Sequence, residues 1–199
     1  LFMARDRFGV KPLYYSILNS TLIFSSEIKA LWEAGVQKLL NEEVCSAYLK
    51  YGTYGNLEDT FWKHIYQLPA GNFAIFKNNG LNISRWYHFD KEVKKVQKAD
   101  HKIDFIKYLL NDSVKIRFRA DVPVGVNLSG GVDSSTLLSI IKILFKNTIN
   151  LKAFTFYTGD EKYDELPWVK KMINNIKCDL VECLLQPNDV PEMTKEIME

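Results

Sequence analysis

The amino-acid sequence predicts a mixed fold in which an α+β N-terminal part is followed by an α/β part with a parallel sheet. Residues 1–90 are rich in aromatic side chains, short β-like runs and turns, whereas helix and strand patterns alternate from about Asp104 onward. Between them, residues 91–102 are charged and poor in turn residues, and they are expected to form a solvated linker. A chain of 199 residues is long enough for one large domain or two small ones.

The elements of the first part follow from local patterns. Residues 21–24 predict a strand, and the helix after it is expected to start at Ser25, with a serine cap and an acid in its first turn. Residues 42–50 predict a second, short helix. Two apolar runs, 73–76 and 81–83, flank an Asn-Asn-Gly sequence and predict a hairpin with a three-residue turn.

The second part alternates between helical and extended patterns. Apolar residues recur at helical spacing in a first helix at Ile103, Ile106, Leu110 and Val114. After a strand at 124–128, one face of a second helix is expected to be marked by Leu137, Ile140, Ile141, Leu144 and Phe145, with Leu138 beside them. A strand at 152–157, a helix over about 164–177 and a strand at 180–185 complete a β-α-β-α-β order, which implies a parallel sheet covered by helices.

Composition excludes several classes of protein. The chain is 47% hydrophobic, so it can bury a core, and its net charge of +2 gives no reason to expect nucleic-acid or membrane binding. Three cysteines without metal-site spacing favour a reduced, cytoplasmic setting. Charges at positions 5–7 argue against a signal peptide, and no apolar run is long enough to span a bilayer. Because the chain opens within a strand pattern and closes within a helix pattern, we expect it to be a fragment of a longer protein.

The run 121–135, Asp-Val-Pro-Val-Gly-Val-Asn-Leu-Ser-Gly-Gly-Val-Asp-Ser-Ser, carries the clearest functional signal. A strand enters a Ser-Gly-Gly turn and a helix starts after it, and a helix N-terminus attracts anions. Gly130 and Gly131 let a phosphate reach backbone N–H groups, Ser129 and Ser134 add hydroxyl donors, and Asp133 fits beside a phosphate if Mg²⁺ lies between them. A tight turn with an ordinary N-cap explains Ser-Gly-Gly equally well. Neither a Gly-Lys-Ser/Thr loop nor a Gly-x-Gly fingerprint occurs.

The run 128–135 resembles the pyrophosphate loop of the ATP-pyrophosphatase (PP-loop) enzymes, and with Asp-Val-Pro-Val-Gly in front it resembles glutamine-dependent asparagine synthetases in particular. The resemblance implies that ATP and pyrophosphate bind to Ser129, Gly130, Gly131, Val132, Asp133, Ser134 and Ser135, with Asp133 also holding Mg²⁺. It further implies adenosine contacts from Asn127, Leu128 and Phe156. The family usually has Leu where this chain has Asn127, and core packing is the alternative role for Phe156. Glu161, Asp164 and Glu165 follow the carboxyl end of the strand at 152–157, where α/β sheets bind ligands, but for Asp164 we expect a helix cap.

A second segment, residues 4–15, resembles the late part of class II glutamine amidotransferase domains through Arg-Asp-x-x-Gly-x-x-Pro-Leu, and Leu-Pro-Ala-Gly at 68–71 resembles a turn of asparagine synthetases. We expect scaffold roles here: a buried Arg5–Asp6 ion pair, and a turn shaped by Gly9 and Pro12. The resemblance implies the C-terminal portion of an Ntn-type glutaminase sandwich at 1–90, a linker at 91–102 and the N-terminal portion of a PP-loop synthetase domain at 103–199.

Together the two matches imply an asparagine synthase that amidates aspartate through β-aspartyl-AMP with glutamine-derived ammonia. The small-molecule substrates are then ATP, aspartate and glutamine, the cofactors are ATP and Mg²⁺, and the full-length protein is a candidate homodimer. Two alternatives stay open: a related amidotransferase acting on another carboxylate, such as an uronic acid, and an inactive truncated product. None of the three internal cysteines is an N-terminal nucleophile, so we expect no complete catalytic set within these residues.

Overall fold

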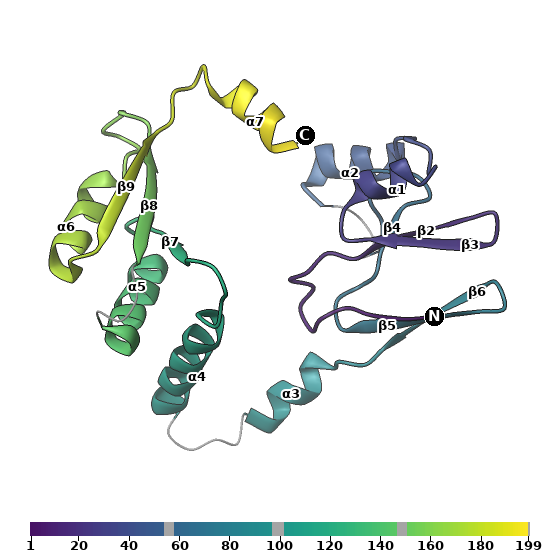
Figure 1. Cartoon of the computed structure of the whole chain (residues 1–199), viewed down its shortest axis with the longest axis horizontal. Coiled ribbons are helices and arrows are strands. Elements are labelled where there is room, and N and C mark those ends of the chain that lie inside the picture. The colour runs from purple at the N-terminus through teal and green to yellow at the C-terminus, as the bar shows by residue number, and fades with distance from the viewer. Residues whose placement is uncertain (54–57, 97–101, 147–150, 199) are drawn as a thin grey trace. The chain divides into compact units, whose positions relative to one another are not determined.

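The computed structural model describes residues 1–53, 58–96, 102–146 and 151–198 (Figure 1). The chain divides into two compact units, Leu1–Lys98 and Ala99–Glu199, each with a hydrophobic core of its own. The first unit contains antiparallel sheets and the second a parallel sheet, so the predicted mixture of α+β and α/β structure is confirmed.

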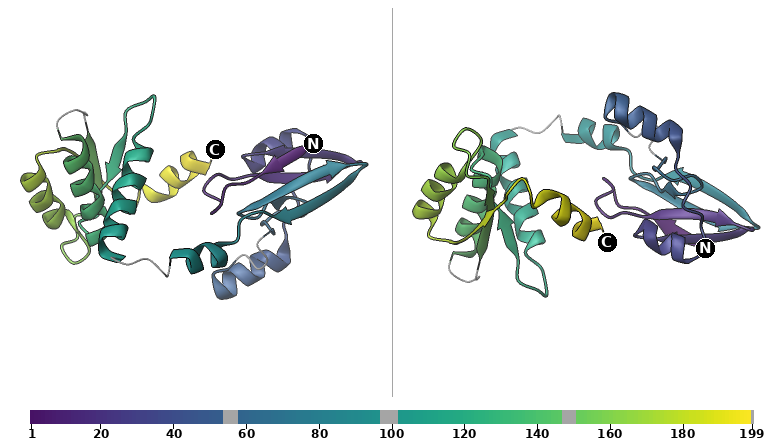
Figure 2. Two further views of the ribbon diagram at one scale, coloured as in Figure 1. Left: turned by 90° about the horizontal axis from the view of Figure 1, so that it is seen from below. Right: turned by 90° about the horizontal axis from the view of Figure 1, so that it is seen from above.

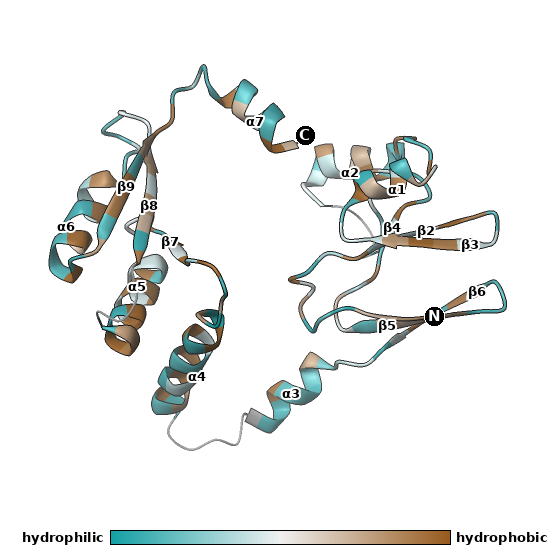
Figure 3. Ribbon diagram, in the orientation of Figure 1, coloured by the Kyte–Doolittle hydropathy of each residue, from teal (hydrophilic) through white to brown (hydrophobic). Residues whose placement is uncertain are grey.

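The first unit holds two three-stranded antiparallel sheets. One has the order β1 (Phe2–Ala4), β5 (Asn72–Lys77), β6 (Gly80–Arg85), and the other the order β3 (Thr21–Ser25), β2 (Tyr14–Leu18), β4 (Tyr66–Gln67). Residues of both sheets meet in one buried cluster of Met3, Tyr15, Leu68 and Ala74. The sheets therefore pack as two layers, and apolar residues colour much of the β2–β3 hairpin brown in Figure 3.

Three helices accompany these sheets: α1 (Ile28–Glu33), α2 (Glu42–Tyr51) and α3 (Phe89–Val96). Helix α1 buries Leu31 in a cluster with Val36 and Ile65, against which Tyr14 of β2 and Ile23 of β3 also pack. Helix α2 confirms the helix predicted at 42–50 and is capped by the Asn41 side chain, which accepts from Val44 N at 3.4 Å. Helix α3 occupies part of the stretch expected to be a linker.

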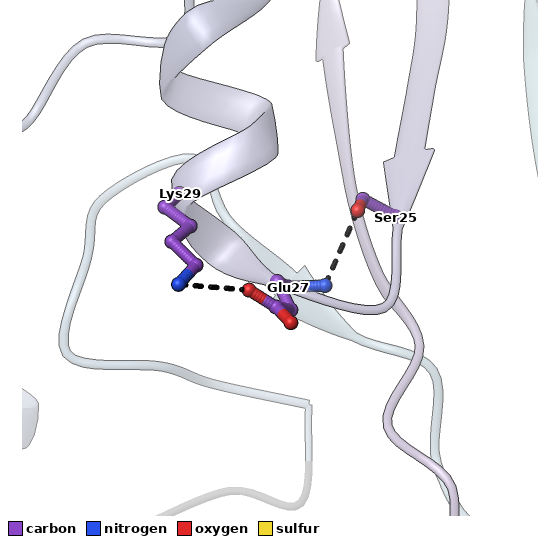
Figure 4. Close-up of polar contacts among 3 residues, drawn as sticks. All are labelled: Ser25, Glu27 and Lys29. Atoms are coloured by element: carbon purple, nitrogen blue, oxygen red, sulfur yellow. Dashed lines mark hydrogen bonds and ion pairs between the residues drawn. The ribbon is translucent and has the colours of Figure 1, made fainter. Parts of the chain in front are cut away.

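The start of α1 differs from the prediction. Its N-cap is Glu27, whose side chain makes no capping bond, and its first turn contains no acid. Ser25 Oγ instead accepts a hydrogen bond from Glu27 N at 3.2 Å, and the Glu27 carboxylate lies 3.2 Å from Lys29 Nζ (Figure 4). The Ser25 hydroxyl therefore stabilises a local turn at the end of β3 and does not cap the helix, which begins after that turn.

The β5–β6 hairpin is tighter than predicted. Lys77 pairs with Gly80, so the loop consists of Asn78 and Asn79 alone, and both have positive φ angles, 51° and 61°. Two successive positive φ angles define the type I′ turn, which matches the twist of the strands. Asparagine tolerates this conformation, and Gly80 is therefore the first residue of β6 and not part of the turn.

Arg5 and Asp6 do not form the expected buried ion pair. The buried Arg5 guanidinium donates to three carbonyls: Nε to Lys11 O at 2.8 Å, Nη1 to Leu68 O at 2.6 Å and Nη2 to Gly9 O at 2.9 Å. The Asp6 carboxylate accepts from the N–H groups of Phe8, Val10 and Lys11 at 3.0–3.2 Å. Arg5 and Asp6 thus each fix loop backbone. Gly9 has the positive φ, 66°, that the expected turn needs.

The second unit runs in the order α4 (Lys102–Arg117), β7 (Gly125–Asn127), α5 (Val132–Phe145), β8 (Lys152–Tyr157), α6 (Leu166–Ile176), β9 (Asp179–Leu184) and α7 (Val190–Met198). The strands form a parallel sheet of order β7-β8-β9, which confirms the predicted β-α-β-α-β pattern. Helix α5 contacts β7, α6 contacts β8 and the two helices contact each other, while α4 packs on α5 (Figure 2).

The buried face of α5 is rotated from the one predicted. Leu138 and Ile141 are buried, whereas Leu137 is 43% exposed. On α4 only Val114 of the four predicted residues is buried, and Ile103, Ile106 and Leu110 are exposed. The helices cover one face of the sheet; on β8, Ala153 and Thr155 are buried and Phe154 and Phe156 are exposed.

Candidate nucleotide-binding site

The predicted phosphate loop connects β7 to α5. Gly131 is the N-cap of α5 and has extended backbone angles, and Gly130 before it has a φ of 76°, which disfavours any residue with a side chain. A Cβ on Gly130 would lie 3.0 Å from Trp168 Cβ and 3.3 Å from Glu165 O. Glycine is therefore required here both by conformation and by the close approach of the start of α6.

Serine hydroxyls brace the loop from inside. Ser129 Oγ and Ser134 Oγ lie 3.1 Å apart, Ser134 Oγ accepts from Ser129 N at 3.3 Å, and Ser129 Oγ accepts from Gly131 N at 3.4 Å. The first turn of α5 closes where Ser135 N donates to Gly131 O at 3.1 Å. The N–H groups of the three residues before Ser135 are thus the helix-terminal donors that an anion would meet.

Asp133 lies in this first turn and its side chain is exposed. Across residues 1–53, 58–96, 102–146 and 151–198, no three His, Cys, Asp or Glu side chains gather into a metal-binding group. A lone carboxylate suits Mg²⁺ only where phosphate oxygens and waters supply the other ligands, which is the usual arrangement for Mg²⁺ with a nucleotide. Asp133 therefore fits the predicted ion as one ligand beside a bound nucleotide.

A cavity of about 470 Å³ opens at the carboxyl ends of β7 and β8. Four of the predicted residues line it: Asn127, Leu128, Ser129 and Phe156. Ser129 is the last loop residue that lines the cavity. The other predicted loop residues are not part of its lining and continue the chain into α5: Gly130, Gly131, Val132, Asp133, Ser134 and Ser135. Ligands of open α/β sheets bind at this edge.

Phe156 belongs to this cavity and not to the core. It is 69% exposed because side chains alternate along β8, and its position is on the face that the helices leave open. Its neighbour across the parallel ladder is Cys183 of β9, which also lines the cavity. The core-packing alternative for Phe156 is therefore wrong.

Asp164 and Glu165, which were noted from the sequence for their position past the end of the strand, also line the cavity. Other residues of the wall were not singled out from the sequence: Phe154, Thr155, Thr158, Tyr163 and Cys183. The position of Thr158 and Tyr163 just after a predicted parallel strand is the one signal that favours them, because that is where such sheets bind ligands.

Asp164 does not cap α6. The N-cap of this helix is Glu165, whose side chain makes no capping bond. The Asp164 carboxylate reaches back to the end of β8: Oδ1 accepts from Thr158 N at 2.6 Å and from Thr158 Oγ1 at 3.0 Å, and Oδ2 accepts from Gly159 N at 2.8 Å. The Thr158 backbone hydrogen bond, together with those from the Thr158 hydroxyl and Gly159, holds the pKa of Asp164 below its usual range.

Comparison with known families agrees with both sequence segments. Residues 106–199 match the asparagine synthase family, and residues 1–87 match the glutamine amidotransferase domain family. Among the described residues, no helix is both long enough and apolar enough to cross a membrane.

Relatives align along nearly the whole chain. A putative asparagine synthetase (glutamine-hydrolysing) 2 of Methanocaldococcus jannaschii is 34% identical over 198 residues, which are 97% of this chain and 38% of the relative. Asparagine synthetase (glutamine-hydrolysing) 3 of Bacillus subtilis is 29% identical over 98% of this chain and 34% of its own length. The amidase chry2 of Gibberella zeae is 32% identical over 76% of this chain and 22% of its own length.

The sequence and its relatives thus define a protein that pairs a glutamine amidotransferase region with a synthase region. The chain belongs to the glutamine-dependent asparagine synthetase family, as the two motifs predicted, and it spans about a third of the length of the first relatives it matches.

Proposed function

We propose that this chain is part of an ATP-dependent carbon–nitrogen ligase that converts aspartate to asparagine with ammonia from glutamine. Residues 1–90 then contribute to a glutaminase domain, 91–102 link it to the second domain, and 103–199 contribute the ATP site of a PP-loop synthetase domain. The family matches to residues 1–87 and 106–199 support this division.

The observation that carries the proposal is the loop from Ser129 to Ser134 beside the 470 Å³ cavity. The glycine with positive φ, the braced serines and the start of α5 give a rigid set of N–H donors for pyrophosphate, and the adjoining cavity offers Asn127, Leu128 and Phe156 to the adenosine. A rigid donor set stabilises phosphoryl charge without reorganisation during the reaction.

The proposed chemistry has two steps. A carboxylate oxygen of aspartate attacks the α-phosphorus of ATP, the bond to the bridging oxygen breaks, and pyrophosphate leaves on the loop. Ammonia then attacks the acyl carbon, loses a proton, and AMP leaves with the former carboxylate oxygen. Activation is needed because a carboxylate oxygen is a poor leaving group and AMP is a good one. Mg²⁺, held by Asp133 and phosphate oxygens, would supply positive charge to the leaving pyrophosphate.

Exchange of labelled pyrophosphate into ATP tests this function in the full-length protein. We expect exchange that depends on aspartate and falls at least about a hundredfold in Asp133→Ala, since loss of a metal ligand removes several kcal/mol of charge stabilisation. Asp160→Ala, a carboxylate outside the loop, is the matched control and should retain exchange. Undiminished exchange in Asp133→Ala would remove the Mg²⁺ assignment.

A second candidate is amidation of a different carboxylate. The similarity of this chain to two proteins named amidases supports this second candidate. The same exchange measurement separates the two, because exchange supported by another carboxylic acid, such as an uronic acid, and not by aspartate would select the second candidate.

A further inference from the structure

Asp164 joins the cavity wall to the start of α6. Its two carboxylate oxygens accept three hydrogen bonds from Thr158 and Gly159, and the longest is 3.0 Å. Thr158 itself lines the cavity, two residues after Phe156. These bonds hold the chain where it leaves β8, because a carboxylate that accepts from two successive N–H groups fixes both peptide planes.

The segment that follows Asp164 also lies close against the phosphate loop. Glu165 O and Trp168 Cβ lie within 3.3 Å of the position that a Cβ on Gly130 would take. One short stretch, from Asp164 to Trp168, therefore contacts the loop after β7 and the loop after β8. The carboxylate bonds act only on the second of these two loops.

We propose that Asp164 is a positioning residue of the nucleotide site, which holds Thr158 and Gly159 so that the wall formed by Phe156, Thr158 and Tyr163 has its nucleotide-binding shape. This inference rests on the proposed function and assigns a role to a residue that acts through its neighbours. It predicts damage to adenosine binding without damage to pyrophosphate binding, since the Ser129–Ser134 bracing is independent of Asp164.

The direction in which AMP affinity changes when Asp164 loses its charge distinguishes a positioning role from a purely electrostatic one. A carboxylate near a nucleotide repels its phosphates, so removing that charge alone strengthens binding. Positioning predicts the opposite for Asp164→Asn, because an amide cannot accept from all three donors. Glu161→Gln is the matched control: it removes a carboxylate from the same connection, and Glu161 accepts none of the bonds from Thr158 or Gly159.

Isothermal titration of the full-length protein with AMP, and separately with inorganic pyrophosphate, tests the proposal. For Asp164→Asn we expect AMP to bind about tenfold more weakly or worse and pyrophosphate to bind within about twofold of the original affinity. Glu161→Gln should bind AMP as tightly as the unmodified protein or more tightly. Thr158→Val, which removes only the hydroxyl bond, should weaken AMP binding by a smaller factor and serves if Asp164→Asn does not fold.

Unchanged AMP affinity in Asp164→Asn would overturn the positioning role. The role would also be overturned if Asp164→Asn and Thr158→Val each weakened the binding of AMP and of pyrophosphate by the same factor. If the unmodified protein binds neither AMP nor pyrophosphate, the proposed function itself fails, and that result is distinct because it needs no variant.

Discussion

Gly130→Ala is the substitution whose effect can be worked out most fully from the structure. Gly130 has a φ of 76°, and an added Cβ would lie 3.0 Å from Trp168 Cβ, 3.3 Å from Glu165 O and 3.5 Å from Val169 Cγ2. Two of these neighbours are a backbone oxygen and a Cβ, which cannot move aside by changing a rotamer. The substitution therefore adds backbone strain and crowding at once.

The magnitude follows from two controls. Gly159 has a φ of 80° but nothing within 4 Å of its Cβ position, so Gly159→Ala measures strain alone, about 1–2 kcal/mol. Gly131 has extended angles and only Ser129 Oγ nearby, so Gly131→Ala should cost under about 1 kcal/mol, the loss of a glycine N-cap. Adding about 1–3 kcal/mol of crowding to the strain gives about 2–5 kcal/mol for Gly130→Ala.

Native-state hydrogen exchange of the β8 amides measures these differences, because the slowest amides of a buried strand report the opening of the whole unit. We expect the order Gly130→Ala, then Gly159→Ala, then Gly131→Ala, from most to least destabilised. Equal destabilisation by Gly130→Ala and Gly159→Ala would show that α6 does not press on the loop, and the reasoning about the loop would fail.

Three further predictions concern the scaffold. Leu138→Ala should destabilise the second unit by about 2–5 kcal/mol and Leu137→Ala by under about 1 kcal/mol, because only Leu138 is fully buried; urea unfolding of both checks this, and equal effects would contradict the packing described for α5. Arg5→Lys should cost about 2–4 kcal/mol, since an ammonium cannot reach three carbonyls in the guanidinium geometry, and thermal unfolding that is unchanged would refute it. The bonds from Lys11 N and Val10 N lower the pKa of Asp6, so the stability that this carboxylate contributes is present above the ordinary carboxyl pKa and is lost as the pH falls through the lowered pKa. Asp6→Asn should therefore make the loss of stability below about pH 4 less steep. The same loss of stability with pH in Asp6→Asn and in the unmodified protein would count against this prediction.

The elements of the parallel sheet were predictable because their signals are local. The strand expected at 152–157 is β8 with the same bounds, since an apolar run of that length between turn-forming residues admits few other structures. The Ser-Gly-Gly turn between a strand and a helix was visible for the same reason. The hairpin was predicted too, but Gly80 was wrongly counted as a turn residue. The turn consists of Asn78 and Asn79 alone, because asparagine tolerates the positive φ angles that it needs.

The remaining differences depend on tertiary contacts. Arg5 and Asp6 are adjacent and opposite in charge, yet both bind backbone of the loop that follows them: Arg5 donates to the carbonyls of Gly9 and Lys11, and Asp6 accepts from the N–H groups of Val10 and Lys11. Helix α5 carries apolar residues around most of its circumference, and its packing against β7, α4 and α6 selects Leu138 over Leu137. Asp164 binds backbone five and six residues before it, a spacing that matches no capping motif, and so its role was not visible from the sequence.

The central claim, adenylation of a carboxylate at the loop after β7, is tested most directly by following oxygen. The full-length protein would be given ATP, glutamine and aspartate labelled with ¹⁸O in its side-chain carboxylate, and the products would be examined by mass spectrometry. We predict one ¹⁸O atom in the phosphate of AMP for each asparagine formed, with unlabelled pyrophosphate. Label in inorganic phosphate, with ADP as the nucleotide product, would show attack on the γ-phosphorus and would contradict the account.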